Sequence, residues 1–331
     1  MFDDKSVLIT GGTGSFGKKF TRYLFENYKP KKVVILSRDE FKQFEMSAVF
    51  REPEYEIRYF IGDIRDKERL YRSFEGIDYV IHAAALKQVP AAEYNPFEAV
   101  KTNILGAQNI IDAAIDRGVK KVIALSTDKA VSPINLYGAT KLAMEKLLIA
   151  ANSYVGTKDT CFSVVRYGNV IGSRGSVIPF FKNFVNNGGG KLPITDERMT
   201  RFWITLQQGV ELVSKAAYEA VGGEVFVPKI PSMKILDLAR VIAPHREYEV
   251  IGVRPGEKLH ESLISKDEGR NTVDMDKYYV ILPLSANGSK KFYKYSKYPK
   301  MVEGFCYRSD TNDRWLGEED LANLVKEFES Q

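Results

Sequence analysis

The sequence predicts a doubly wound α/β fold, in which helices cover both faces of a parallel sheet. Short apolar segments typical of buried strands alternate with longer amphipathic segments, about every 25 to 40 residues over the first half of the chain. The first such strand runs into a glycine-rich turn, and a helical pattern follows it. After residue 167 the alternation gives way to a segment rich in glycine and polar residues, which indicates a second, smaller α/β lobe.

Composition limits the classes of protein to which the chain can belong. Its 331 residues are 44% hydrophobic and 27% charged, as is typical of a soluble globular protein. There is no long apolar run and no signal-peptide pattern, so we expect a cytoplasmic protein without a membrane span. Cys161 and Cys306 predict neither a disulfide framework nor a metal site. The net charge of +5 is not clustered as in nucleic-acid binders, and it fits phosphate-bearing small molecules.

The glycine-rich turn is the first candidate binding site. A strand over residues 6–10 leads into it, and a helix follows over about 15–27, which is the Rossmann order for binding a dinucleotide. Gly11 permits a tight turn, Gly14 lets a pyrophosphate approach the helix N-terminus, and Gly17 lets helix and strand pack closely. The residues expected to contact the cofactor here are Gly11, Thr13, Gly14, Ser15, Phe16 and Gly17.

The end of the second strand, residues 32–36, carries the signal for the type of cofactor. About 20 residues past the glycines, an NAD-binding chain places an acid on the ribose 2′-hydroxyl. Here Ser37 and Arg38 occupy that position, with Lys42 one helical turn further. Because a cation suits a 2′-phosphate, we predict NADP rather than NAD. Asp39 leaves an alternative open, since it could cap the next helix or serve as the acid for NAD.

The third and fourth strands, residues 55–61 and 78–81, end in residues that suit the rest of the cofactor. Asp63 could bond an adenine amino group or cap the next helix. His82 is expected to pack at its strand end, because nothing nearby in the sequence pairs with it. Small residues after it allow close approach of the cofactor, and Lys87 could meet phosphate or sugar. The expected contacts are Asp63, Ile64, Ala83, Ala84, Ala85 and Lys87.

A helix predicted over about 96–117 carries Asn103 in its middle. A polar residue at such a place is either solvated or, if buried, able to fix the geometry of a strand end. We include Asn103 among the expected cofactor-binding residues.

The candidate reaction centre joins a buried strand, residues 122–125, to the helix that follows it. Tyr137 and Lys141 are four residues apart and therefore lie on one face of that helix. The strand ends on a run of polar residues, at the edge where open parallel sheets bind ligands. The stretch thus brings an alcohol, an acid, two amines and a phenol to one place: Thr127, Asp128, Lys129, Tyr137 and Lys141.

These side chains suggest two kinds of chemistry. Tyr137 is the candidate acid or base on a substrate alcohol, but its free pKa of about 10 is too high for a base. Lys141 and a nearby cationic nicotinamide would lower that pKa, and Thr127 could bond the same alcohol. Asp128 and Lys129 are surplus to a simple dehydrogenase and suit elimination of water, for which Lys129 could be neutral if burial or nearby cations depress its pKa. Alternatively, these two residues only form an ion pair.

The second half of the chain returns to the sheet before it forms the smaller lobe. After a sixth strand over 162–167, a helix over 206–221 and a strand over 224–227 are predicted to rejoin the sheet. The turn 254–258 holds two cations that suit a diphosphate or a uracil-ribose, although an ordinary basic turn fits equally well. We therefore assign 1–167 and about 203–228 to an NADP-binding Rossmann domain, and about 168–202 and 229–331 to a substrate-binding lobe.

The motifs resemble the extended short-chain dehydrogenase/reductase family of nucleotide-sugar enzymes. Within it, the chain most resembles the inverting UDP-N-acetylglucosamine 4,6-dehydratases that begin pseudaminic acid synthesis, a sugar of flagellin and other bacterial surface structures. The resemblance covers nearly the whole chain and is weakest over about 267–305. The matching motifs are Ile-Thr-Gly-Gly-Thr-Gly-Ser-Phe-Gly (9–17), Ser-Arg-Asp-Glu (37–40), His-Ala-Ala-Ala-Leu-Lys (82–87), Leu-Ser-Thr-Asp-Lys-Ala (125–130), Asn-Leu-Tyr-Gly-Ala-Thr-Lys (135–141), Arg-Tyr-Gly-Asn-Val (166–170), Ser-Arg-Gly-Ser-Val (173–177), Met-Thr-Arg-Phe-Trp (199–203) and Arg-Pro-Gly-Glu-Lys (254–258).

The resemblance implies a homo-oligomer, a dimer or a hexamer, that holds NADP permanently and recycles it in each turnover. Tyr137, Lys141 and Thr127 would assist oxidation at the sugar C4. Lys129 would remove the C5 proton, and Asp128 would help the C6 hydroxyl leave as water. Hydride return to C6 and reprotonation of C5 on the opposite face would give the L-arabino 4-keto-6-deoxy sugar. The positions matched to UDP and sugar are Lys87, Asn169, Val177, Thr195, Met199, Arg201, Arg254 and Glu257.

Four alternatives are considered at this point. Retaining dehydratases usually carry Asp-Glu where this chain has Asp128 and Lys129, and capsule-forming dehydratase/epimerases lack the tyrosine at position 137, so both differ from this chain. A UDP-hexose 4-epimerase would need Tyr137 and Lys141 but neither residue of the acid–amine pair. A non-catalytic NADP-binding scaffold would need none of the reaction-centre residues, and their intact set counts against it.

Overall fold

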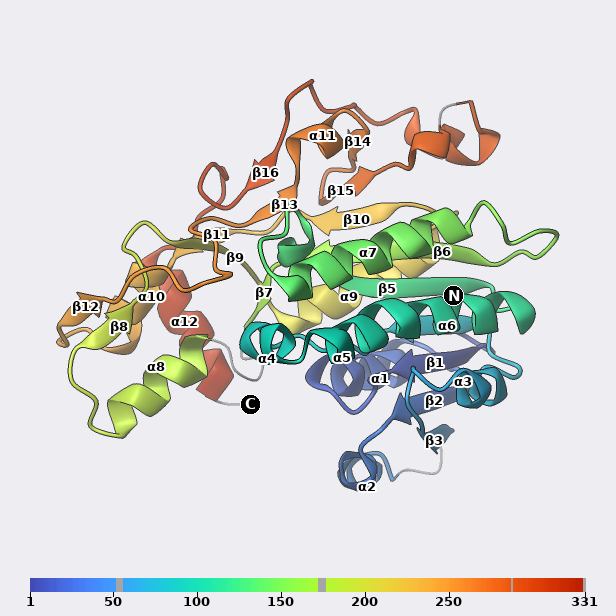
Figure 1. Cartoon of the computed structure of the whole chain (residues 1–331), viewed down its shortest axis with the longest axis horizontal. Helices are drawn as coiled ribbons and strands as arrows, with labels where there is room; N and C mark the ends of the chain where they lie inside the picture. Colours follow the sequence, from blue (N-terminus) through green and yellow to red (C-terminus); the bar gives the residue numbers. More distant parts are fainter. Residues whose placement is uncertain (52–55, 172–176, 287, 330–331) are drawn as a thin grey trace.

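A nine-stranded sheet forms the centre of the molecule in the computed structural model, which describes residues 1–51, 56–171, 177–286 and 288–329 (Figure 1). Its strand order is β14-β15-β10-β6-β5-β4-β1-β2-β3. The strands from β10 to β3 run parallel to their neighbours, and β15 and β14 add an antiparallel edge. The predicted doubly wound sheet is therefore confirmed. The strands are β1 (Ser6–Thr10), β2 (Lys32–Ser37), β3 (Ile57–Ile61), β4 (Tyr79–His82), β5 (Lys121–Thr127), β6 (Cys161–Tyr167), β10 (Val225–Pro228), β14 (Thr272–Asp274) and β15 (Tyr278–Ile281).

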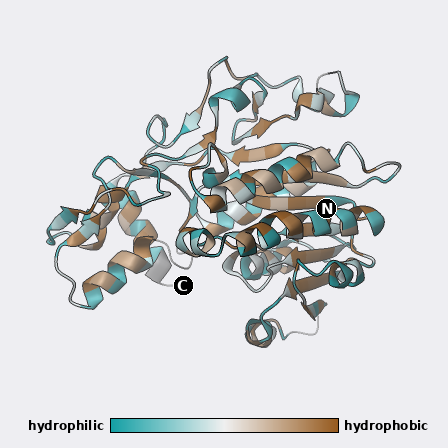
Figure 2. Ribbon diagram, in the orientation of Figure 1, coloured by the Kyte–Doolittle hydropathy of each residue, from teal (hydrophilic) through white to brown (hydrophobic). Residues whose placement is uncertain are grey.

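Helices cover both faces of this sheet, as apolar parallel strands require. α7 and α6 pack together on one face, and α1 and α9 pack together on the other (Figure 1). The central strands are mostly hydrophobic, whereas the helices carry hydrophilic residues among their apolar ones (Figure 2). β1 is buried at every position, which explains its unbroken apolar run. The helices of this part are α1 (Ser15–Asn27), α2 (Glu40–Val49), α3 (Lys67–Ser73), α4 (Val89–Tyr94), α7 (Leu136–Ala151) and α9 (Leu206–Glu219).

The helix predicted over 96–117 is present but is not regular. α5 (Pro96–Val100) passes into a π-helical turn at Lys101–Leu105, which continues as α6 (Gly106–Asp116). Such a turn accommodates one extra residue and is often found at functional sites. Here it contains Asn103, whose side chain would not be held in the same place by a regular α-helix.

A second hydrophobic core lies in the smaller lobe, formed mainly by three helices. Leu238, Phe181 and Leu321 are examples of its buried residues. The three-stranded sheet β11-β9-β7 lies between this lobe and the central sheet (Figure 1). The elements are β7 (Asn169–Val170), α8 (Val177–Asn186), β8 (Leu192–Ile194), β9 (Thr200–Ile204), β11 (Ser232–Lys234), α10 (Ile235–Ile242), β12 (Tyr248–Val250), β13 (Ser262–Ile264), α11 (Lys266–Gly269), β16 (Tyr307–Arg308) and α12 (Glu318–Glu329).

The return of the chain to the sheet follows the prediction, with one addition. β10 pairs with β6 in parallel, and α9 precedes it, as expected. In addition, β15 pairs with β10 in antiparallel register, so part of the segment assigned to the smaller lobe extends the central sheet. The division into two domains stays a prediction. Among the described residues, no helix has the length and apolar character needed to cross a membrane.

Candidate active site

A cavity of about 1580 Å³ opens at the carboxyl ends of the parallel strands. It extends from the glycine-rich turn to the end of β5, as expected for an open α/β sheet. The cavity therefore brings together most of the residues that the sequence singled out. Those that line it are Gly11, Thr13, Gly14, Ser15, Phe16, Gly17, Ser37, Arg38, Lys42, Asp63, Ile64, Ala83, Ala84, Ala85, Lys87, Thr127, Asp128, Lys129, Tyr137, Lys141 and Asn169.

The glycines of the turn leave no room for larger residues. Gly11 has a φ of 64°, and a Cβ there would lie 2.9 Å from the Cα of Ala84. A Cβ on Gly17 would lie 2.3 Å from the carbonyl oxygen of Gly12. Gly14 is the N-cap of α1 and lines the cavity, so the positive end of this helix lies beside it. The turn thus has the shape and polarity of an anion-binding cradle.

At the end of β2, two cations line the cavity and both are paired. The Arg38 guanidinium lies 3.6 Å from the Asp63 carboxylate, and Lys42 pairs with Asp39. Asp39 also caps α2, because its side chain accepts a hydrogen bond of 3.0 Å from the Lys42 amide. Burial alone would raise the pKa of Asp63, but its hydrogen bonds from Arg65 outweigh burial and lower it.

Asn103 lies behind the cavity wall. Its amide accepts from the Leu86 N–H at 2.9 Å and donates to the Leu86 carbonyl oxygen, also at 2.9 Å. It also donates to the Thr140 hydroxyl at 2.9 Å. The side chain of Asn103 therefore bonds to protein groups and fixes the segment after β4. Of the two possibilities left open by the sequence, solvated or buried, the structure shows the buried one.

His82 is packed as expected. It is buried, and its Nδ1 shares a hydrogen bond of 2.8 Å with the Thr10 hydroxyl. Burial, together with the nearby charge of Lys141, lowers the pKa of His82 to about 3, so the ring is neutral at physiological pH.

The reaction centre lies where β5 ends and α7 begins. Asn135 caps α7 through a bond of 2.8 Å from the Gly138 amide, and it donates to the Gly256 carbonyl oxygen at 2.8 Å. Asn135 therefore connects the start of α7 to the turn 254–258 of the smaller lobe. Tyr137 and Lys141 follow on the buried face of this helix.

Burial shifts the pKa values of Tyr137 and Lys141 in opposite directions. Burial raises the pKa of Tyr137 to about 12, against the lowering effects of Lys129 and Thr127. Burial lowers the pKa of Lys141 to about 8. In the protein alone, desolvation of the phenolate outweighs the nearby cations. The lowered Tyr137 pKa expected beside a cationic nicotinamide stays a prediction.

Asp128 and Lys129 form an ion pair, which is compatible with both interpretations of the sequence. The Asp128 Oδ1 accepts from the Thr127 hydroxyl at 2.8 Å and from the Lys129 Nζ at 3.1 Å. Burial disfavours the ammonium, but Asp128 and Glu261 outweigh burial and raise the pKa of Lys129. The condition given for a neutral Lys129, a pKa depressed by burial or nearby cations, is therefore not met in the protein alone.

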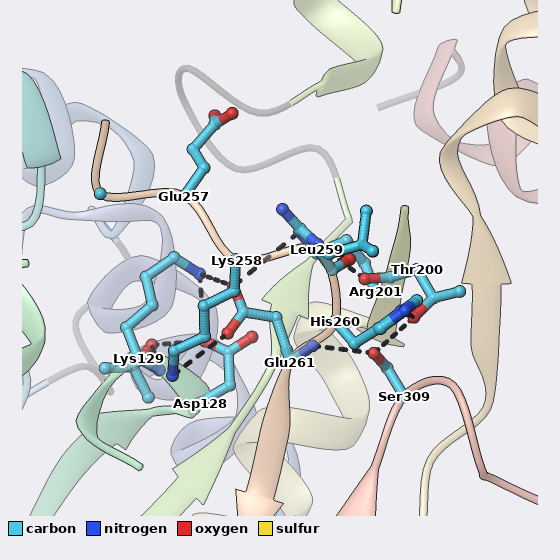
Figure 3. A network of polar contacts seen from close by, with 12 residues as sticks. Asp128, Lys129, Thr200, Arg201, Glu257, Lys258, Leu259, His260, Glu261 and Ser309 are labelled. Atoms are coloured by element: carbon cyan, nitrogen blue, oxygen red, sulfur yellow. Dashed lines mark hydrogen bonds and ion pairs between the residues drawn. The ribbon is translucent and has the colours of Figure 1, made fainter. Parts of the chain in front are cut away.

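Glu261 is a site residue that sequence analysis missed. It is 2% exposed, and its Oε1 lies 3.6 Å from the Lys129 Nζ (Figure 3). Arg201 and Lys258 lie on its other sides, at 3.9 and 4.0 Å. Its only local signal is an acid just after the basic turn, and nothing in the sequence connects that acid to a lysine more than a hundred residues earlier.

The other expected substrate-binding residues lie in or beside the smaller lobe. Arg201 donates to the main-chain oxygens of Thr200 and Leu259 next to Glu261. Arg254 and Glu257 pair at 3.8 Å on the turn that Asn135 holds. Thr195 and Met199 are buried there, and Val177 begins α8. Of the matched motif 173–177, residues 173–176 lie outside the described part of the chain, as does residue 55 of the predicted third strand.

A family model described as "Polysaccharide biosynthesis protein" matches residues 7–283. The chain belongs to this family.

Three relatives are similar to the chain over nearly its whole length. It is 56% identical to the UDP-N-acetylglucosamine 4,6-dehydratase (inverting) of Campylobacter jejuni, over 99% of both chains. It is 42% identical to the UDP-glucose 4-epimerase of Rickettsia massiliae, over 98% of this chain and 96% of that one. The crystal structure of Pen from Bacillus thuringiensis has a TM-score of 0.90 to it, at 42% identity and with full coverage of both chains.

Proposed function

We propose that the chain catalyses the inverting 4,6-dehydration of UDP-N-acetylglucosamine, with NADP bound and recycled. The product would be UDP-2-acetamido-2,6-dideoxy-β-L-arabino-hexos-4-ulose, and the enzyme would be a hydro-lyase. The observation that carries the proposal is that Asp128 and Lys129 share one cavity with Tyr137 and Lys141. An oxidation centre and an acid–amine pair in one cavity suit oxidation followed by elimination. The 56% identity to an enzyme of that name supports this assignment.

The cavity fits a nicotinamide dinucleotide. The glycine turn would hold the pyrophosphate at the start of α1, and Arg38 with Lys42 would meet a 2′-phosphate. Their carboxylate partners are Asp63 and Asp39, so the phosphate would share these cations. When bound, the cofactor supplies the hydride acceptor and donor.

The chain's own residues would act in two steps, oxidation at C4 and elimination of water. Tyr137 and Thr127 would hold the C4 hydroxyl. Tyr137 would first lose its own proton to solvent, which a bound cationic nicotinamide would favour, and its phenolate would then take the proton of that hydroxyl. Lys129 would remove the C5 proton, and Asp128 would pass a proton to the departing C6 hydroxyl. Because Lys129 and Tyr137 both line the cavity, one bound sugar could meet both.

The nucleotide would lie toward the smaller lobe. Arg254 and Arg201 are cations suited to the UDP diphosphate, and Asn169 lines the cavity. The Asn135–Gly256 hydrogen bond would couple the position of UDP to that of Tyr137. We further propose that the protein is a cytoplasmic homo-oligomer and that its product enters a pathway to a pseudaminic-acid-type surface sugar.

UDP-hexose 4-epimerisation is the second candidate, because relatives at 42% identity carry that name. An epimerase would use Tyr137 and Lys141 but not the acid–amine pair. A double variant, Asp128→Asn with Lys129→Ala, would therefore keep full activity if the chain is an epimerase and would lose dehydration if the proposal holds.

The deciding experiment is proton NMR of UDP-N-acetylglucosamine incubated with the purified protein in D2O. A C6 methyl signal, deuterium at C5 and L-arabino couplings are the expected result. Retained configuration at C5 would overturn the stereochemistry alone. UDP-N-acetylgalactosamine as the sole product would establish the epimerase instead.

A further inference from the structure

The carboxylate of Glu261 is buried beside Lys129 of the reaction centre. Its main chain is held by Ser309, whose hydroxyl accepts from the Glu261 amide at 2.9 Å and whose amide donates to the Glu261 carbonyl oxygen at 2.9 Å. The Ser309 hydroxyl in turn bonds that of Thr200 at 2.7 Å. The residue just before β13 is therefore fixed in position, with its side chain directed at Lys129 (Figure 3).

The charges around Glu261 come from four residues on three segments. Asp128 and Lys129 follow β5, Arg201 lies on β9, and Lys258 lies on the preceding turn. Lys258 is also held by a bond of 2.6 Å to the Val131 carbonyl oxygen. Among the described residues, the buried Oε2 of Glu261 has no hydrogen-bond partner and lies 4.0 Å from the Lys258 Nζ, and the Oδ2 of Asp128 is likewise buried without such a partner. A buried carboxylate oxygen without a partner is costly, which suggests a use for it.

The proposed removal of the C5 proton requires Lys129 to lose a proton first. Lys129 must be a neutral amine to accept that proton, yet it lies between two carboxylates as an ammonium. The Asp128 Oδ1 already accepts two hydrogen bonds, from Thr127 and Lys129. Asp128 is also the group proposed to pass a proton to the C6 hydroxyl, so Glu261 is the remaining carboxylate beside Lys129 that can take the proton Lys129 must lose.

We propose that Glu261 is a positioning residue that takes the Nζ proton of Lys129 and leaves a neutral amine facing the sugar C5. This role rests on the dehydration proposed above. Burial first, and Asp128 second, raise the pKa of Glu261 against the effects of the three cations, so the carboxyl holds a proton more readily than an exposed glutamate.

The proton transfers balance as follows. An N–H bond of Lys129 breaks and an O–H bond forms on Glu261. The freed electron pair takes the C5 proton, and the C5–H electrons pass into the 4-keto group as an enolate. The enolate expels the C6 hydroxyl, which receives the Lys129 proton through Asp128 and leaves as water. Glu261 then returns its proton to Lys129, which restores the ammonium–carboxylate pair.

Glu261→Gln tests this role, because glutamine keeps the size of the side chain but cannot take a proton from an ammonium. After addition of UDP-N-acetylglucosamine, absorbance reports the reduced cofactor, and NMR in D2O reports exchange at C5. We expect C4 oxidation and UDP affinity, measured by calorimetry, to stay near wild-type values. Exchange at C5 should fall by about 100-fold or more at neutral pH and rise with pH, since Lys129 must then lose its proton to solvent.

Two other results would overturn the role of Glu261. If the carboxylate only clamps Lys129 as an ammonium, its removal lowers the pKa of Lys129, and exchange at C5 would be unchanged or faster. If Glu261 is only structural, C4 oxidation, exchange and UDP affinity would fall together. Glu268→Gln is the matched control, because Glu268 is a largely buried carboxylate that pairs with Arg166 and not with Lys129. It should lose stability without any change in the ratio of exchange to oxidation.

Glu261→Asp keeps the test decisive if the glutamine variant does not fold. A shorter carboxylate should slow exchange about tenfold but keep its rate independent of pH near neutrality. An exchange rate that rises with pH in this variant would contradict the proposal. Wild-type protein that neither forms a C6 methyl group nor exchanges at C5 would overturn the proposed function, and the role of Glu261 with it. Exchange in the wild type and in Glu261→Gln at equal rates would overturn the role of Glu261 alone.

Discussion

The Lys141 Nζ donates a hydrogen bond of 2.6 Å to the main-chain carbonyl oxygen of Leu125. This bond joins the catalytic helix α7 to the strand β5 beside it, so it sets the distance between Tyr137 and the end of that strand. The ammonium is buried next to the Met144 sulfur, at 3.1 Å. Burial without a full counter-ion is why the pKa of Lys141 falls to about 8.

That lowered pKa predicts a pH-dependent stability difference between wild-type protein and Lys141→Met. Below about pH 8, Lys141 is charged in both the folded and the unfolded wild-type protein. Folding therefore includes the cost of burying that charge. As the pH rises from about 8 to the unfolded value of 10.5, the folded state loses this proton first, so wild-type stability rises relative to the variant. We expect a relative gain of up to about 3 kcal/mol. Urea unfolding of both proteins across this range measures it, and a constant difference would contradict the burial of the charge.

Arg38 is predicted to select NADP. Arg38→Ala should weaken NADP binding about 10- to 100-fold, because a charge-assisted contact to the 2′-phosphate is lost, and should leave NAD binding nearly unchanged. Titration of the protein with each cofactor measures both affinities. Arg58→Ala is the matched control, since Arg58 is an exposed arginine on β3 that pairs with Glu56. Tighter binding of NAD than of NADP by the wild type would contradict the cofactor assignment.

Much of the fold could be predicted because its signals are local. The apolar run of β1, the glycines after it and the helix that follows all lie within residues 6–27. The length of β5 was underestimated, because its last residues, such as Thr127, are polar yet still pair with β6. β14 and β15 were assigned to the smaller lobe, because β14 pairs with β15, and the pairing of β15 with β10 joins segments far apart in the sequence.

The protonation states at the site could not be predicted for the same reason. The charge on Lys129 depends on Glu261, which lies on another segment and reaches it only in the fold. The pKa of Tyr137 depends on how deeply its ring is buried, and spacing alone does not give that depth. Residue types and spacing therefore predicted which groups meet but not which of them carry protons.

Asn103 is predicted to stabilise the fold through the segment after β4. Asn103→Ala should reduce the free energy of unfolding by about 2–4 kcal/mol, since it leaves the N–H and carbonyl groups of Leu86 without their partner. Cofactor affinity should fall as well, because Ala85 and Lys87 on either side of Leu86 line the cavity. Urea unfolding and NADP titration measure the two effects. Asn27→Ala, which removes an exposed bond to the Tyr23 carbonyl oxygen, should change stability by less than about 0.5 kcal/mol.

Arg166 is predicted to be the costliest buried charge to remove. Its guanidinium bonds Glu145 at 3.1 and 2.6 Å, Glu268 at 3.1 and 2.9 Å, and the Leu263 carbonyl oxygen at 2.9 Å, and so joins β6, α7 and the start of α11. Arg166→Met should reduce the free energy of unfolding by about 3–5 kcal/mol, because two carboxylates lose their cation.

The added change Glu145→Gln distinguishes a charge effect from a packing effect. It removes one of the two unpaired carboxylates, so the double variant should recover about 1–2 kcal/mol relative to Arg166→Met. Urea unfolding of the wild type, both single variants and the double variant gives the coupling between the two side chains. If the two losses simply add, the cost of Arg166→Met comes from the lost packing of its side chain, and the ion pairs contribute nothing measurable to holding α7 against β6.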